Sequence, residues 1–154
     1  MPTTFKESLL KATNLKGHVI TKADRDLIIA ALAPLDATWA IDAMVKAPIA
    51  GCHFRIPWGK RHPDSIHHIE WLDAHGIIEE AKNHQPGIAA LLSGYFPVGR
   101  DPEGNPNGYF LRCATANDPA LYQAYHDKVG PDGRLESRSI KRVLPNVADV
   151  LKYA

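Results

Sequence analysis

Helix-like and strand-like patterns occupy different parts of this chain, and their separation is the strongest constraint on its fold. The first third predicts three helices, one starting at Thr4, one over 21–33 and one over 36–46. The last third predicts a final helix over 146–153, preceded by short strands over 95–98, 109–113, 121–126 and 140–144. Helices that precede strands with short connections favour an α+β fold with an antiparallel sheet over βαβ winding.

Capping and stop signals mark the predicted helices. Thr4 is followed three residues later by Glu7, and Thr21 is followed by Asp24, so each threonine is a candidate N-cap. Pro34 is expected to end the second helix because proline has no amide hydrogen to donate. The 12 prolines and 11 glycines of the chain predict many short connections between elements.

The middle of the chain predicts one strand and then a histidine-rich helix. Cys52, Phe54 and Ile56 alternate with polar residues, which is typical of a half-buried strand. A helix is then expected from Pro63 to Gly76, because Ile66, Ile69 and Leu72 recur at every third position. Further helical structure is expected over 79–82 and 87–92, on either side of a Gln-Pro-Gly break.

Charge and composition narrow the class of protein. The 18 basic and 17 acidic residues leave a net charge of +1, which provides no global field for nucleic acid or an anionic membrane. The basic clusters at 59–62 and 138–142 have no regular aromatic spacing, so nucleic-acid binding is not expected. With 45% hydrophobic and 23% charged residues and no repeat or linker, residues 1–154 are expected to form a single folded domain.

The sequence also predicts a cytoplasmic protein. Residues 1–7 do not resemble a secretory signal, and no apolar run approaches the roughly 20 residues that span a bilayer. Cys52 and Cys113 are too few for a disulfide framework, and we expect both to be small buried hydrophobes.

Seven of the eight histidines lie between His53 and His126. His67, His68 and His75 fall with Glu70 in the predicted helix, where a pair of histidines on one face would suit a metal ion. The HExxH spacing is missing, and solvent-facing histidines opposite an apolar stripe explain the same pattern. No metal site is therefore predicted, although a small metal-dependent hydrolase built on this cluster is retained as an alternative function.

Other catalytic patterns are also missing. Ser93 is not in a GxSxG elbow, and the glycines of 99–104 match neither a P-loop nor a dinucleotide-binding motif. Cys52 and His53 are adjacent on a predicted strand, which directs their side chains to opposite faces. The sequence predicts no catalytic residue, no cofactor and no enzymatic activity.

The last 60 residues resemble a known family. The stretch Tyr95–Asp101, the glycine-rich loop that follows it, the stretch Gly108–Arg112 and the segment 118–127 together resemble the core of the SUKH superfamily. The best match covers 94–153. The loop over 102–107 is longer and richer in proline than the family's usual turn, and 58–85 has no matching motif.

This resemblance implies a curved antiparallel sheet flanked by helices, and a binding module instead of an enzyme. The superfamily includes a fungal regulator of cell-wall assembly and many bacterial immunity proteins that neutralise toxins, often nucleases or deaminases. The matching positions look structural: Gly99, Asp101 and Gly108 in the turn, and Tyr109 and Leu121 in the core. Glycines at 99, 104 and 108 would permit positive backbone dihedrals, and Asp101 is expected to cap its own loop.

The leading hypothesis is an immunity protein that occludes a toxin's active site. Aromatic and arginine side chains in polar surroundings are its candidate anchors: Trp58, Arg61, Trp71, Arg100 and Tyr125. An acidic stretch would attract a basic partner: Asp64, Glu70, Asp73, Glu79 and Glu80. The contact is expected within 58–85. A structural role in a larger assembly remains an alternative, and the oligomeric state is left open.

Overall fold

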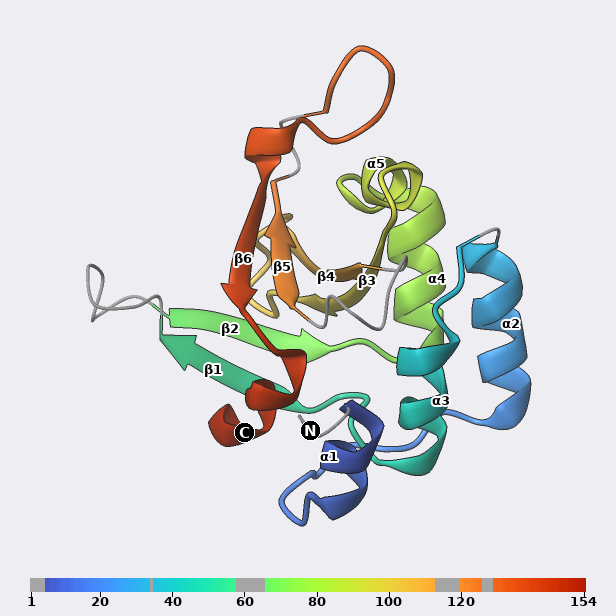
Figure 1. Ribbon diagram of the computed structural model, residues 1–154, viewed down its shortest axis with the longest axis vertical. Helices are drawn as coiled ribbons and strands as arrows, with labels where there is room; N and C mark the ends of the chain where they lie inside the picture. The colour runs from blue at the N-terminus through green and yellow to red at the C-terminus, as the bar shows by residue number, and fades with distance from the viewer. Residues whose placement is uncertain (1–4, 34, 58–65, 113–119, 126–128) are drawn as a thin grey trace.

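The computed structural model describes residues 5–33, 35–57, 66–112, 120–125 and 129–154. It is a mixed α+β fold (Figure 1). The helices are α1 (Phe5–Lys11), α2 (Lys22–Leu32), α3 (Thr38–Lys46), α4 (Ala74–Asn83) and α5 (Gly87–Leu92), with the 3-10 helices η1 (Ser137–Ser139) and η2 (Val147–Tyr153). The strands are β1 (His53–Pro57), β2 (Ile66–Trp71), β3 (Tyr95–Arg100), β4 (Gly108–Arg112), β5 (Leu121–Ala124) and β6 (Ile140–Leu144). Some predicted features lie outside the described residues: the cap at Thr4, Pro34, the Cys113 thiol, and the candidates Trp58, Arg61 and Asp64.

The six strands form one antiparallel sheet in the order β1-β2-β3-β4-β5-β6. Figure 1 shows the sheet curling: β1 and β2 lie across the page, while β5 and β6 lie nearly upright in it. β2 pairs with β3 only through Glu70 with Arg100 and Trp71 with Gly99, and β3 is bulged between Pro97 and Gly99. Because bulges increase local bending and twist, this irregularity in the β3–β4 pairing contributes to the curl of the sheet. The expected curved antiparallel sheet flanked by helices is confirmed.

Gly99 and Gly108 lie within strands, and neither has a positive φ, so the expected turn role is wrong for them. Gly99 is needed for a close approach, because a Cβ there would lie 2.5 Å from Cγ2 of Ile69. Gly104 has the positive φ of 95° that the loop requires.

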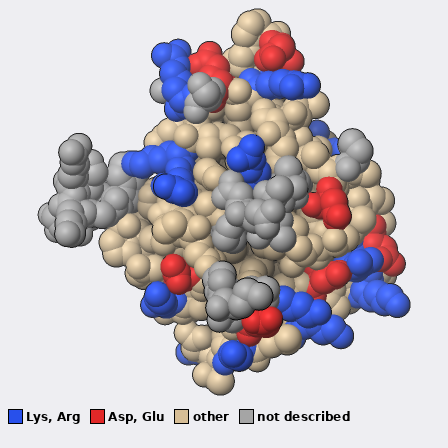
Figure 2. Space-filling model, viewed as in Figure 1, with Lys and Arg blue, Asp and Glu red and all other residues tan. Residues whose placement is uncertain are grey.

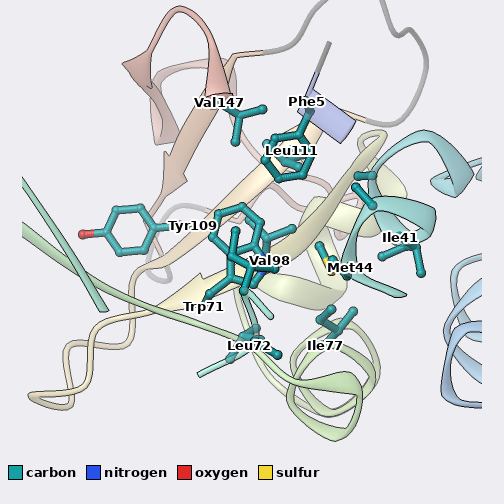
Figure 3. Close-up of a cluster of buried hydrophobic side chains, with 14 of the residues drawn as sticks. Phe5, Ile41, Met44, Trp71, Leu72, Ile77, Val98, Tyr109, Leu111 and Val147 are labelled. Atoms are coloured by element: carbon teal, nitrogen blue, oxygen red, sulfur yellow. The ribbon is translucent and has the colours of Figure 1, made fainter. Parts of the chain in front are cut away.

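The helices of the first third are confirmed. The Thr21 hydroxyl accepts a hydrogen bond from the Asp24 amide at 3.0 Å, which caps α2. Cys52 is buried, as expected, and its thiol donates to the Pro48 carbonyl. Figure 3 shows how the core joins the two ends of the chain, with Phe5 of α1, Trp71 of β2 and Val147 of η2 in one apolar cluster.

The predicted helix from Pro63 to Gly76 is wrong over 66–71, which form β2. The buried side chains there are His67, Ile69 and Trp71, which is the period of a strand, and Ile66 is 46% exposed. The helix begins after Asp73, whose carboxylate accepts from the Gly76 amide at 2.8 Å. Pairing with β1 explains the difference, because the partner strand satisfies the backbone and buries the alternate residues.

The final helix is confirmed, and it is of the 3-10 type. As predicted, Asn146 caps it by accepting a hydrogen bond from the Ala148 amide at 3.0 Å, and the residues that follow form η2. In the described ranges, none of the helices combines the length and apolar character required to cross a bilayer.

Candidate functional site

The outward side of the β1–β2 hairpin carries the most connected group of polar side chains. In the antiparallel register, His53 lies opposite Glu70 and Arg55 lies opposite His68. Successive side chains alternate between faces, so these four point outward while Phe54 and Ile69 enter the core. We define the hairpin face as these outward residues together with the residue that β3 adds beside Glu70: His53, Arg55, Pro57, Ile66, His68, Glu70 and Arg100.

Arg100 and Glu70 form the strongest contact of the hairpin face. Nε and Nη2 of Arg100 donate to Oε1 of Glu70 at 3.1 and 2.8 Å. The Arg100 side chain is 57% exposed although both bonds hold it. A pair this exposed contributes little to stability. Its consequence is a guanidinium held in one orientation on a rigid strand.

The contacts continue across the hairpin face to two histidines. Oε2 of Glu70 lies 3.5 Å from Nε2 of His53, and Nδ1 of His53 lies 3.0 Å from Nε2 of His68. Nδ1 of His68 lies 4.0 Å from Oε1 of Glu103. Arg100, Glu70, His53, His68 and Glu103 therefore form one continuous chain of charged and polar groups.

Trp71 does not belong to this surface, so its expected role as an anchor is corrected. Its side chain is fully buried, and its ring lies 5.9 Å from that of Phe5 and 6.2 Å from that of Phe54. The strand geometry is the cause, because Trp71 follows the outward Glu70 and so faces the core.

The two acidic candidates on α4, Glu79 and Glu80, have different surroundings. Glu80 is partly buried, and burial raises its pKa, while the positive charges of His84 and Arg100 oppose that shift. Glu79 accepts from Nδ2 of Asn83 at 3.1 Å and pairs with His84 at 3.3 Å, near the end of α4.

The remaining candidates have structural surroundings. Tyr125 follows β5 and its amide donates to the Ser139 carbonyl at 2.9 Å. Asp101 accepts from the Glu103 amide at 2.9 Å, which confirms the expected loop cap. Tyr109 and Leu121 are buried, as expected. Of the predicted partner contacts that the structure describes, Glu70 and Arg100 are in direct contact with each other.

The histidines of the alternative hydrolase do not converge. His68 points outward from β2, His75 is exposed on α4, and His67 points inward. Within the described part of the chain, no group of three or more His, Cys, Asp or Glu side chains is placed to hold a metal ion.

His67 belongs to a buried polar cluster. Nδ1 of His67 lies 3.1 Å from the Tyr109 hydroxyl, which points out of the apolar core in Figure 3 and also accepts from Nε2 of Gln123 at 3.4 Å. Burial, with a contribution from the charge of Lys141, lowers the pKa of His67 to about 4. Burial also raises the pKa of Tyr109 well above its usual range. Both groups are therefore neutral near pH 7.

No protein-family model and no curated protein matches this chain. The arrangement of side chains on the surface is therefore the starting point for a functional assignment.

A small pocket of about 200 Å³ borders the hairpin face where β2 meets the first turn of α4. Its charged and imidazole lining comes from Glu70, Arg100, Asp73, His18 and His75. The polar surface therefore continues from the hairpin toward α4.

The sequence offered a signal for this surface. His68 and Glu70 alternate with Ile69 and Trp71, which is a period-two pattern like that of β1. Two such strands joined by a short connection predict an antiparallel pair, which would have placed His53 beside His68 and Glu70.

Proposed function

We propose that this chain is a non-catalytic protein-binding module that neutralises a cognate bacterial toxin by binding it and occluding its active site. The observation that carries the proposal is Arg100, an exposed guanidinium held on β3 by two hydrogen bonds from its side chain to Glu70. Arginine is enriched among the residues that dominate binding energy at protein interfaces. Fixing its orientation before binding reduces the entropy lost when a partner docks.

The surroundings of Arg100 suit a protein partner. The hairpin face combines charged groups with exposed apolar surface, including Ile66 at 46% exposure. A stable interface buries roughly 1,600 Å² in total, so it would extend beyond these strands. In sequence, the connection between β1 and β2 carries Trp58 and Arg61, which would enlarge the contact.

The toxin class follows from the resemblance to the SUKH superfamily, whose immunity proteins often oppose nucleases or deaminases. Such a partner would act in the cytoplasm, where we place this protein. Figure 2 shows basic and acidic side chains interspersed over the visible face, in keeping with the net charge of +1. Attraction to a basic toxin would therefore be local, from Asp73 in the pocket beside the hairpin face and from Glu79 and Glu80 farther along α4.

The experiment co-expresses the chain with the toxin domain encoded by the neighbouring reading frame. We expect rescue of growth, co-purification and a 1:1 complex by calorimetry. Arg100→Ala should weaken binding by about 2 kcal/mol, or roughly 30-fold, as loss of an interface hot spot does. Arg138→Ala is the matched control, because Arg138 is also exposed and paired with a glutamate, Glu136 at 2.8 Å.

The outcomes separate the alternatives. A folded protein that neither binds the toxin domain nor protects cells would overturn the immunity role. If the Arg100 and Arg138 variants lost equal toxin affinity, the hairpin face would not be the interface. Stable incorporation into an assembly with no toxic component would support a structural role instead.

A further inference from the structure

Two histidine nitrogens face each other across β1 and β2. Nδ1 of His53 and Nε2 of His68 are 3.0 Å apart, and the two ring centroids are 5.2 Å apart. These residues are diagonal neighbours on the hairpin face, since His53 lies opposite Glu70 and His68 lies opposite Arg55. We propose that His53 and His68 bind a divalent transition-metal ion of the Zn²⁺ class between these two nitrogens.

The spacing suits a metal that imidazole ligands prefer. Zinc–nitrogen bonds of about 2.0–2.1 Å at a tetrahedral angle place two ligating nitrogens about 3.3 Å apart. The facing nitrogens would therefore separate by only a few tenths of an ångström to admit the ion. The His53 side chain is 49% exposed, so an ion can reach it from solvent.

The carboxylates beside the two rings favour this use. Glu70 lies at Nε2 of His53, and Glu103 lies at Nδ1 of His68, so each carboxylate is next to the nitrogen that faces away from the other ring. If Glu70 accepts the hydrogen of Nε2, Nδ1 of His53 is left bare, as in carboxylate–histidine–metal arrangements; Glu103 is too far from Nδ1 of His68 for a hydrogen bond and adds only its negative charge. Without a metal, the two rings share a hydrogen bond across this 3.0 Å contact, and an entering ion would displace its proton.

The charges around the pair nearly cancel. Arg55 on β1 and Arg100 on β3 are positive, Glu70 on β2 and Glu103 in the following loop are negative, and Arg100 is already paired with Glu70. The two imidazoles must therefore supply the affinity. Since the described residues add no third ligand of the usual types, water or a partner's side chain would complete the coordination.

The test is a calorimetric titration of the full chain, prepared without a histidine tag, with ZnCl₂ near pH 7.5. We expect one site, and at least tenfold weaker binding in His53→Ala and in His68→Ala, each checked for folding by circular dichroism. His84→Ala is the matched control, because His84 is exposed and its ring pairs with Glu79 at 3.3 Å. That variant should bind zinc like the wild type.

Nitrogen-15 NMR of the histidine rings supplies a second measurement. Zinc should change the nitrogen-15 chemical shifts of Nδ1 of His53 and Nε2 of His68 selectively. Acidification should reverse both changes, because protons compete with zinc for the same lone pairs. Wild-type affinity no greater than that of the two alanine variants, or shifts on other histidines alone, would overturn the proposal. Because no toxin is present, this result is independent of the proposed immunity role.

Discussion

Replacing Trp71 with alanine measures whether residues 66–71 act as a strand in solution. In the strand, Trp71 is fully buried and Ile66 is 46% exposed. The helix suggested by the spacing of Ile66, Ile69 and Leu72 would bury Ile66 instead. The two single variants therefore separate the two structures.

The expected magnitude comes from the burial of the indole. Truncating a buried tryptophan to alanine costs about 3–5 kcal/mol, because transfer energy is lost and a cavity is left. With a urea slope of about 2 kcal/mol per molar, a loss of about 4 kcal/mol lowers the unfolding midpoint by about 2 M. Ile66→Ala removes an exposed side chain and should cost less than about 1 kcal/mol.

The assay is equilibrium urea unfolding followed by far-ultraviolet circular dichroism, with wild type, Trp71→Ala and Ile66→Ala in parallel. A protein of typical stability, about 5–15 kcal/mol, can remain folded after the larger loss. If Trp71→Ala does not fold, Trp71→Leu retains part of the apolar volume and should still lose more than Ile66→Ala. Equal losses, or a larger loss at Ile66, would refute the strand assignment.

Three further substitutions test the packing and burial of this fold. His67 has a folded pKa of about 4, below its unfolded value, so the unfolded chain binds the extra proton and stability should fall as the pH drops from about 6.5 toward 4. The urea midpoint of the wild type should therefore decline over that range more than that of His67→Gln, and parallel declines would contradict the assignment. Gly99→Ala would place a Cβ 2.5 Å from Cγ2 of Ile69 and should lower stability by about 1–3 kcal/mol, which the same assay measures. Gly94→Ala, where the new Cβ meets no atom within 4 Å but φ is 91°, compares that steric cost with backbone strain alone.

The helices of the first third were predictable because their signals are local. Thr21 is an N-cap whose partner, Asp24, lies three residues away, and Ile28 and Leu32 share one face. β2 was not predictable in this way. Ile69 belongs both to a three-residue spacing and to a two-residue spacing, and only pairing with β1 decides between them.

The contacts on the hairpin face were also beyond what local sequence patterns could predict. Glu70 and Arg100 were each identified from residue type and polar surroundings, but their contact depends on how β2 and β3 align. The sequence placed His53 in a strand and His68 in a helix, so it could not bring them together. Contacts between elements distant in sequence depend on the register of the sheet, and one wrong element assignment removes all of its contacts.

Glu70 links the two proposals, because its two oxygens serve different neighbours. Oε1 accepts from Arg100, and Oε2 faces Nε2 of His53. Glu70→Gln should therefore weaken both toxin binding and zinc binding, whereas Arg100→Ala should weaken toxin binding and Glu103→Gln should weaken zinc binding.

Calorimetry with each ligand separately, on these three variants, measures that pattern. If zinc and toxin can both bind, linkage requires that zinc change the toxin affinity by the same factor as the toxin changes the zinc affinity. Loss of zinc binding in Arg100→Ala as large as that in Glu70→Gln would show that Glu70 is not the group that orients His53. Unchanged affinity for both ligands in Glu70→Gln would contradict the shared role of this carboxylate.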